Sequence, residues 1–150
     1  YACYNEGSVR EYQSQNRQFG LGKNFERSGS FGPWLVTRDE FGDPAERTLV
    51  TRLNGIERQR AEMSGMLFDV PHIVSYLSEG YTLQPGDVIV TGSPGALPLQ
   101  PGEKPETPKG PVIVEGQLHM RAGDVCEVEI DGIGTLSNPV IEDPTPPEGA

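Results

Sequence analysis

The stretch TLVTRLNGIERQ, residues 48–59, predicts two antiparallel strands joined by a tight turn. Its first half, residues 48–53, is rich in apolar and β-branched side chains, which is typical of a strand. Asn54 and Gly55 follow, and this dipeptide suits a two-residue hairpin turn because both positions need a positive φ angle. Residues 56–59 are expected to form the returning strand. The chain is therefore expected to build a β-sheet around this hairpin.

Three further apolar runs predict strands elsewhere in the chain. PWLVT covers residues 33–37, QPGDVIVTGSPG covers residues 84–95, and RAGDVCEVEIDGIGTLSNPV covers residues 121–140. The last two each place a Gly-Asp turn ahead of an alternating or continuous apolar pattern, which is typical of strands. The intervals between these similar turns are unequal, so the sequence does not predict a repeat array.

One segment, DVPHIVSYLSEG at residues 69–80, changes to helical periodicity. Its apolar residues recur three and four positions apart, at Val70, Ile73, Val74 and Leu77. Asp69 suits the N-cap, Pro71 suits the first turn, and Gly80 is expected just past the end. This is the one well-formed helix that the sequence predicts.

Composition narrows the class of protein. The chain has 150 residues with 19 Gly, 14 Pro and a hydrophobic fraction of 35%, which indicates one loop-rich, strand-rich domain. A formal net charge of -10, with scattered Lys and Arg, leaves no basic surface for nucleic acid. No apolar run approaches the roughly 20 residues that cross a bilayer, so no membrane partner is expected. Two cysteines outside any CxxC pair favour a reducing cytoplasm.

Four motifs stand in order along the chain: CYNEGSVREYQ, GLGKNFERSGSFGPWLVT, TRLNGIERQRAEMSGMLFDVPHIVSYLSEGYTLQPGDVIVTGSPG and AGDVCEVEIDGIGTLSNPV. Together they resemble the C-terminal catalytic region of the fumarylacetoacetate hydrolase family. The resemblance implies an α+β, mainly β domain over residues 1–143, a mixed β-sheet roll or barrel with few short helices. Residues 97–111 are expected to form a surface excursion, and residues 144–150 a tail.

The resemblance also implies a metal and a set of catalytic residues. The family binds Mg²⁺, Mn²⁺ or Ca²⁺ through carboxylates, and Glu6 stands where the family usually has an Asp ligand. Glu6 is therefore the candidate metal ligand, with an extra methylene that alters the ligand geometry. Arg10 and Gln13 match positions that face the substrate, and Lys23 matches the lysine that stabilises an enolate or oxyanion. These three residues are the catalytic candidates.

The substrate-binding candidates are Ser93, Thr91 and Gln59. Ser93 stands where most family members carry Thr, and it keeps the hydroxyl that binds a substrate carboxylate. A purely structural role remains the alternative for Thr91 and Gln59, and a turn role for Ser93.

Some of the residues that the family uses have no counterpart here. Family members supply two further metal ligands from a Glu-x-Glu pair upstream of the Asn-Asp motif, and a His and a Glu from a mobile lid, and none of these precedes Asn5 in this sequence. Residue 1 is therefore expected to mark a truncation, a processed chain or an ordered remainder. Either a separate chain supplies the missing half, or this chain is not an active enzyme by itself.

The sequence thus predicts a metal-dependent hydrolase or lyase that cleaves C–C bonds in acylpyruvate-type 2-oxo acids, which are small anionic substrates. The resemblance implies a cytoplasmic homodimer. Two alternatives stay open. One is a decarboxylase or isomerase of oxaloacetate- or dienedioate-type substrates, and the other is a non-catalytic subunit that needs another chain to complete the site.

Overall fold

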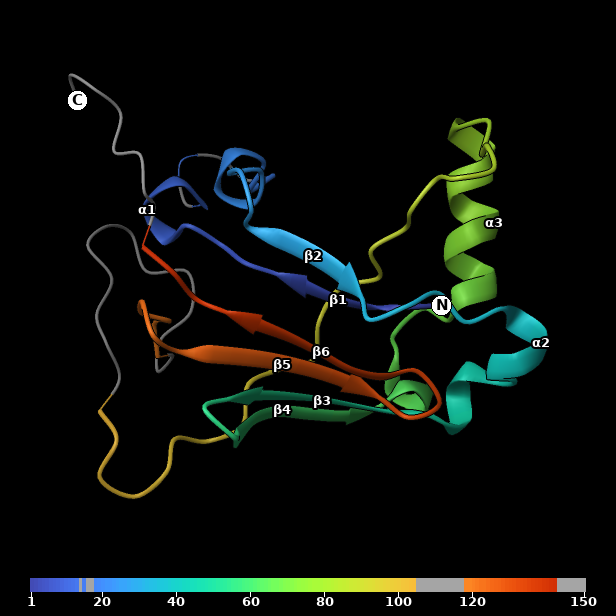
Figure 1. Cartoon of the computed structure of the whole chain (residues 1–150). Coiled ribbons are helices and arrows are strands. Elements are labelled where there is room, and N and C mark those ends of the chain that lie inside the picture. Colours follow the sequence, from blue (N-terminus) through green and yellow to red (C-terminus); the bar gives the residue numbers. More distant parts are fainter. Residues whose placement is uncertain (14, 16–17, 105–117, 143–150) are drawn as a thin grey trace.

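The computed structural model describes residues 1–13, 15, 18–104 and 118–142, and its strands form two antiparallel sheets (Figure 1). The larger sheet has four strands in the order β4-β3-β5-β6. These strands are β3 (Thr48–Leu53), β4 (Ile56–Glu62), β5 (Val125–Ile130) and β6 (Gly134–Pro139). The smaller sheet pairs β1 (Cys3–Glu6) with β2 (Gly29–Gly32). The expected mainly β fold with few short helices is confirmed.

The predicted hairpin is the β3–β4 pair. Asn54 and Gly55 have φ angles of 53° and 78°, as a tight two-residue turn requires. The Asn54 side chain also reaches the start of β5: its Oδ1 accepts from the backbone N–H of Val125 at 2.9 Å, and its Nδ2 donates to Asp124 Oδ1 at 2.9 Å. The turn therefore helps to fix β5 beside β3.

The core lies between the two sheets. β1 runs over the larger sheet (Figure 1), and the buried cluster consists of Cys3, Val36, Phe41, Val128, Ile130, Ile133 and Leu136. Along β5, every second side chain is buried, because successive residues of a strand point to opposite faces. On the opposite face, Arg52 of β3 donates to Glu129 of β5 at 2.5 Å. One face of the larger sheet is therefore apolar and the other is charged.

The helices are short except for α3. They are α1 (Arg10–Gln13), α2 (Arg38–Phe41) and α3 (Val70–Gly80), with the 3-10 helices η1 (Leu21–Lys23), η2 (Pro44–Glu46) and η3 (Met63–Gly65). The predicted helix is confirmed as α3, and Asp69 caps it by accepting from the backbone N–H of His72 at 2.8 Å. Gly80 is its last helical residue rather than the residue after it. Among the described residues, no helix is long and apolar enough to span a membrane.

The strand predicted at residues 33–37 is wrong. β2 ends at Gly32, and Pro33 has no backbone N–H to continue the ladder. Val36 exchanges two backbone hydrogen bonds with Tyr1, at 2.7 and 2.8 Å, and its side chain enters the core. The segment is thus held by one paired position rather than by a strand.

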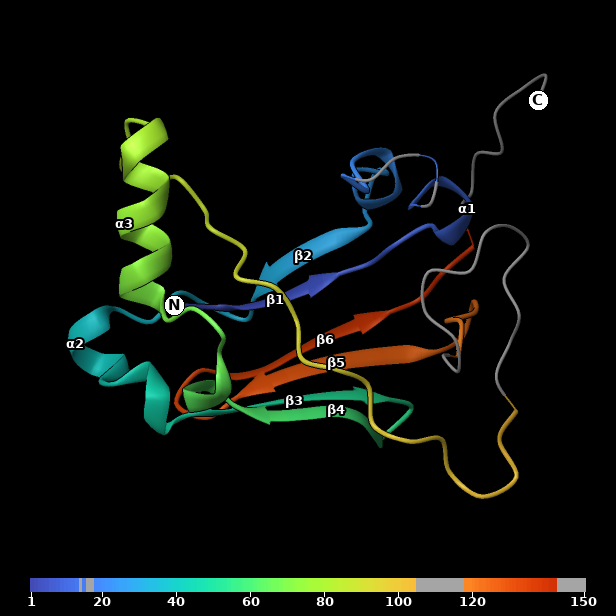
Figure 2. The same ribbon diagram turned by 180° about the vertical axis from the view of Figure 1, so that it is seen from behind.

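The strand predicted at residues 84–95 is also wrong. After a turn in which Asp87 accepts from the backbone N–H of Gln84 at 2.8 Å, the chain runs extended without a ladder to any described strand. Figure 2 shows this segment crossing over the strands after it leaves α3. Val88 and Val90 are 63% and 45% exposed, and only Ile89 between them is partly buried. A strand needs a neighbour, which local sequence does not specify.

The predicted strand at residues 121–140 is confirmed as two strands, β5 and β6, joined by a turn at Asp131 and Gly132. The first part of the predicted excursion, residues 97–104, contains neither helix nor strand. The remainder of that excursion and the predicted tail at residues 144–150 lie outside the described residues.

Candidate functional site

One open cavity of about 1190 Å³ lies between β1, the α1–η1 region and the extended segment after α3. The seven residues assigned to the site from the sequence all line it: Glu6, Arg10, Gln13, Lys23, Gln59, Thr91 and Ser93. They come from segments far apart in the sequence, so the fold brings them together. Their individual roles stay predictions.

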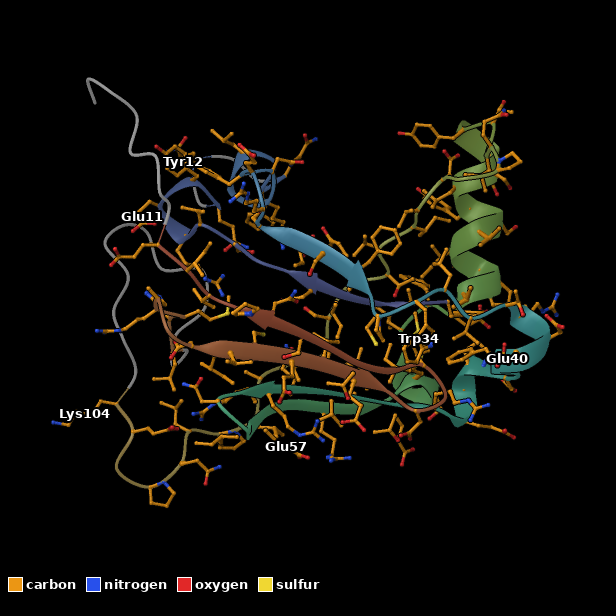
Figure 3. The ribbon with its side chains drawn as sticks, viewed as in Figure 1. Glu11, Tyr12, Trp34, Glu40, Glu57 and Lys104 are labelled. Carbon is orange, nitrogen blue, oxygen red and sulfur yellow. The ribbon has the colours of Figure 1, made fainter. Side chains whose placement is uncertain are left out.

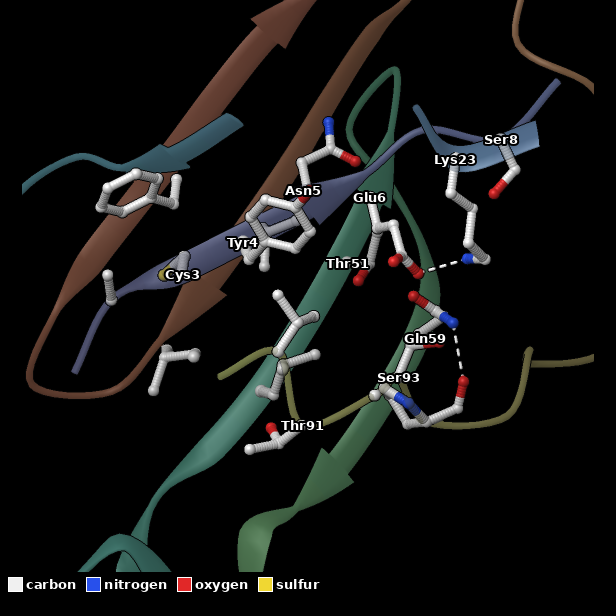
Figure 4. A pocket seen from close by; sticks show the side chains of 18 of the residues that line it. Cys3, Tyr4, Asn5, Glu6, Ser8, Lys23, Thr51, Gln59, Thr91 and Ser93 are labelled. Carbon is white, nitrogen blue, oxygen red and sulfur yellow. Dashed lines mark hydrogen bonds and ion pairs between the residues drawn. The ribbon is translucent and has the colours of Figure 1, made fainter. Parts of the chain in front are cut away.

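Glu6 and Lys23 form an ion pair on one side of the cavity (Figure 4). Glu6 ends β1 and Lys23 ends η1, and their side chains are 35% and 26% exposed. The two segments are tied by the backbone N–H of Val9, which donates to Gly22 O at 2.8 Å. The candidate metal ligand and the candidate catalytic lysine therefore lie in direct contact.

Arg10 and Gln13 lie on α1, next to this pair. Arg10 Nη1 donates to Gln13 Oε1 at 2.5 Å, and Gln13 is only 7% exposed. The backbone of Gly22 packs directly against Gln13, with room for a hydrogen atom but not for a side chain. Gln13 thus orients the Arg10 guanidinium from a buried position.

The other side of the cavity is built by β4 and the extended segment. Gln59 of β4 donates from Nε2 to the backbone carbonyl of Pro94 at 2.7 Å (Figure 4). Thr91 and Ser93 are exposed, so their hydroxyl groups are accessible to a ligand. Gln59 therefore supports the segment that carries Ser93, which is the structural role that the sequence left open for it.

Thr51 also lines the cavity, and the sequence did not single it out. It lies opposite Gln59 in the register of β3 and β4, on the face that carries Leu49 and Leu53. A hydroxyl at the middle of an otherwise apolar alternation is the sequence signal that could have identified it.

The described residues do not complete a metal site. They contain no group of three or more His, Cys, Asp or Glu residues that could hold an ion. Glu6 offers one carboxylate, and its partner in the structure is Lys23. Hard divalent cations take about six oxygen ligands, of which the carboxylate of Glu6 supplies at most two.

The two cysteines are buried packing residues of the sheets rather than candidate nucleophiles. Cys3 is fully buried and Cys126 is 6% exposed. Burial raises the pKa of both thiols, which disfavours the nucleophilic thiolate.

Comparison with known proteins identifies the family. The sequence profile described as fumarylacetoacetate (FAA) hydrolase C-terminal matches residues 1–141. The chain therefore belongs to the fumarylacetoacetate hydrolase family, as the motifs predicted.

Individual relatives agree with that assignment. The oxaloacetate tautomerase YisK of Bacillus subtilis is 34% identical over 140 residues, which cover 93% of this chain and 42% of that protein. The structure of a fumarylacetoacetate hydrolase from the psychrophile Exiguobacterium antarcticum matches with a TM-score of 0.78 and 38% identity, over 94% of this chain and 46% of that one. Fumarylpyruvate hydrolase from Pseudomonas aeruginosa, solved with Mn²⁺ and pyruvate, matches with a TM-score of 0.72 and 28% identity, over 95% and 54%. The chain thus spans about half the length of these relatives.

Proposed function

We propose that this chain forms the substrate-binding part of a divalent-metal-dependent enzyme that cleaves C–C bonds in acylpyruvate-type 2-oxo acids. The observation that carries the proposal is the convergence of seven residues on one cavity in a member of the fumarylacetoacetate hydrolase family. The relative solved with Mn²⁺ and pyruvate supports both the metal and the 2-oxo acid.

The charges and donors of the cavity suit a small anion. Arg10 presents a planar guanidinium that grips a carboxylate at two points, and Thr91 and Ser93 add hydroxyl donors. The net charge of -10 repels an anionic substrate at long range. Local positive charge from Arg10 and Lys23 must therefore overcome this repulsion at the site itself.

Glu6 is proposed as one ligand of Mg²⁺, Mn²⁺ or Ca²⁺, and the remaining ligands come from outside the described residues. When bound, such an ion withdraws electrons from the 2-oxo carboxylate of the substrate. Glu6, which contacts Lys23 in this structure, would hold such an ion through its carboxylate.

Lys23 is proposed to stabilise the enolate that forms as the C–C bond breaks. Its ammonium group is held beside the cavity by Glu6, and Lys23 itself lines the cavity. Positive charge placed where negative charge develops acts mainly in the transition state. Lys23 is thus assigned to the chemical step and Arg10 to binding.

Two other functions have specific support. The oxaloacetate tautomerase relative favours an isomerase or decarboxylase, which uses the same enolate site without a hydrolytic water. The single carboxylate and the missing metal cluster of the described residues favour a non-catalytic subunit completed by a separate chain.

Under the main proposal the protein acts in the cytoplasm as a homodimer.

A substrate panel tests these functions. The assay incubates the 150-residue chain, and any longer protein that carries it, with Mg²⁺ or Mn²⁺ and each of three substrates: acetylpyruvate, fumarylpyruvate and oxaloacetate. The products are then identified. We expect faster cleavage of the acylpyruvates than decarboxylation of oxaloacetate, with both reactions stopped by EDTA. Turnover of oxaloacetate alone would favour the decarboxylase or isomerase, and no turnover of any substrate would favour the non-catalytic subunit.

A further inference from the structure

The extended segment that carries Thr91 and Ser93 forms one wall of the cavity without strand pairing, so something else must hold it in place. We call residues 91–99 the cavity wall. All of its residues line the cavity, although none of them belongs to a helix or strand. Its attachment to the sheet depends on a few contacts with β4.

Two neighbouring side chains of β4 supply these contacts. Gln59 donates to the Pro94 carbonyl at 2.7 Å, and Arg58 binds Glu103 just beyond the wall. The carbonyl of Arg58 also accepts from the backbone N–H of Leu97 at 2.7 Å. Consecutive residues of a regular strand point to opposite faces, so they would not normally serve one segment.

A β-bulge explains this arrangement. The register of β3 and β4 pairs Thr51 with Gln59 and Arg52 with Glu57, which leaves Arg58 as the extra residue. A bulge bends the strand and redirects one side chain, and bulges are frequent next to active sites. Here the bulge lets Arg58 and Gln59 act on the same side of the sheet.

The contact between Arg58 and Glu103 is a two-point ion pair. Arg58 Nη1 and Nη2 lie 2.7 and 2.5 Å from the two carboxylate oxygens of Glu103. The side chains are only 18% and 22% exposed, so water competes weakly with the pair. Glu103 is fixed in turn by the backbone N–H of Gln100, which donates to its Oε2 at 2.7 Å. The pair therefore joins the sheet to the end of the wall through a rigid turn.

We propose that Arg58 is a positioning residue of this site, which holds the cavity wall over the cavity through Glu103 and thereby sets the affinity for a 2-oxo acid. The proposal rests on the proposed function for the nature of the ligand. Arg58 acts through the wall and not on the substrate, because Arg58 does not line the cavity whereas Thr91 and Ser93 do.

The structure offers a matched control for the test. Glu57 precedes Arg58 on β4 and also pairs with an arginine, since Arg60 Nη2 lies 2.5 Å from Glu57 Oε1. Glu57 lies at the outer edge of the sheet (Figure 3) and does not line the cavity. Glu57→Ala thus removes the ion pairs of Glu57 with Arg60 and Arg52, which are more exposed than the Arg58–Glu103 pair, from the same strand without touching the wall.

The first measurement is amide hydrogen exchange in the 150-residue chain. Glu103→Ala is expected to speed exchange of the Leu97 amide, which donates to the Arg58 carbonyl at 2.7 Å, by about tenfold or more, since a hydrogen-bonded charge pair is lost. Glu103→Gln, which keeps an acceptor oxygen, should give a smaller increase, and Glu57→Ala should match the wild type. Unchanged exchange of the Leu97 amide in Glu103→Ala would overturn the proposal.

The second measurement is the affinity for pyruvate in the presence of Mn²⁺, by calorimetry, with the same variants made in a longer protein that carries this chain and supplies the remaining metal ligands. We expect Glu103→Ala to weaken pyruvate binding by about fivefold or more, with Glu103→Gln between it and the wild type. Faster exchange with unchanged affinity would overturn the positioning role, because the pair would then be purely structural. A wild type that binds no pyruvate would count against the proposed function instead, and the exchange data would still decide whether the pair holds the wall.

Discussion

Replacing Gly22 with alanine is expected to force apart the two segments that carry the cationic side of the cavity. A Cβ atom built on Gly22 would lie 2.5 Å from the backbone nitrogen of Gln13 and 2.6 Å from its Cα. Non-bonded heavy atoms prefer separations of about 3.5 to 4.0 Å, so η1 and α1 must move apart by roughly 1 Å. The obstructing atoms are backbone atoms, which cannot rotate aside as the end of a side chain does.

The Gly22→Ala substitution is expected to lower both the stability of the fold and the reaction rate. Overpacking of this kind costs about 1–3 kcal/mol in the free energy of unfolding. A displacement of about 1 Å in a catalytic group lowers the rate by about a hundredfold, because proximity and orientation are lost. Lys23 follows Gly22 directly and Arg10 shares α1 with Gln13, so both candidate groups move.

Urea unfolding and steady-state kinetics on the best substrate of the panel measure these two parts, and Gly20→Ala is the control. Gly20 has no atom within 4 Å of its Cβ position and already has a helical conformation, with φ -53° and ψ -63°. Alanine is therefore tolerated at Gly20. A Gly22→Ala variant within about 0.5 kcal/mol of both the wild type and Gly20→Ala would refute this account of the packing.

Four other expectations concern metal, catalysis, acid stability and the core. The 150-residue chain should bind Mn²⁺ no more tightly than about millimolar, because Glu6 is one carboxylate where the ion wants about six ligands, and micromolar binding in calorimetry would disprove this. Lys23→Met should lower kcat far more than it raises KM, and the reverse pattern in steady-state kinetics would remove Lys23 from the chemical step. The hydrogen bond from Asn54 holds the pKa of Asp124 below its usual value of 3.8, so this carboxylate stabilises the fold above about pH 4 and ceases to do so as the pH falls through its lowered pKa. The urea midpoints of wild type and Asp124→Asn should differ at pH 6, and the difference should shrink as the pH falls below 3.8. Phe41→Ala should cost about 3–5 kcal/mol in urea unfolding, since Phe41 is 1% exposed, and a cost below about 1 kcal/mol would contradict its place in the core.

Local signals made part of the fold predictable. The Asn54-Gly55 turn and the Asp69 cap each depend on residues a few positions apart, so the sequence identified the β3–β4 hairpin and α3 correctly. The segments at 33–37 and 84–95 have strand-like composition, but a strand forms only when a partner lies beside it. That partner is set by the whole fold, and composition alone does not encode it.

The candidate site was likewise predictable only in part. Family motifs led to seven residues that all line the cavity, yet no local pattern predicted that Glu6 would contact Lys23, since they lie 17 positions apart. The bulge at Arg58 could not be predicted from the sequence either, because it appears only in the register of β4 against β3. Both features depend on how separate elements meet.

The hairpin turn also makes Asn54 an expected site of chemical degradation during storage. An asparagine followed by glycine is prone to deamidation, in which the glycine nitrogen attacks the side-chain amide, ammonia leaves, and water opens the ring to an aspartate or isoaspartate. At Asn54 the group lost is the Nδ2 that donates to Asp124 at 2.9 Å. Its replacement is a carboxylate oxygen, which sets two negative charges against each other at the junction of β3 and β5. Old samples of the chain should therefore lose stability first at this junction, and mass spectrometry of the peptide containing Asn54 follows the change.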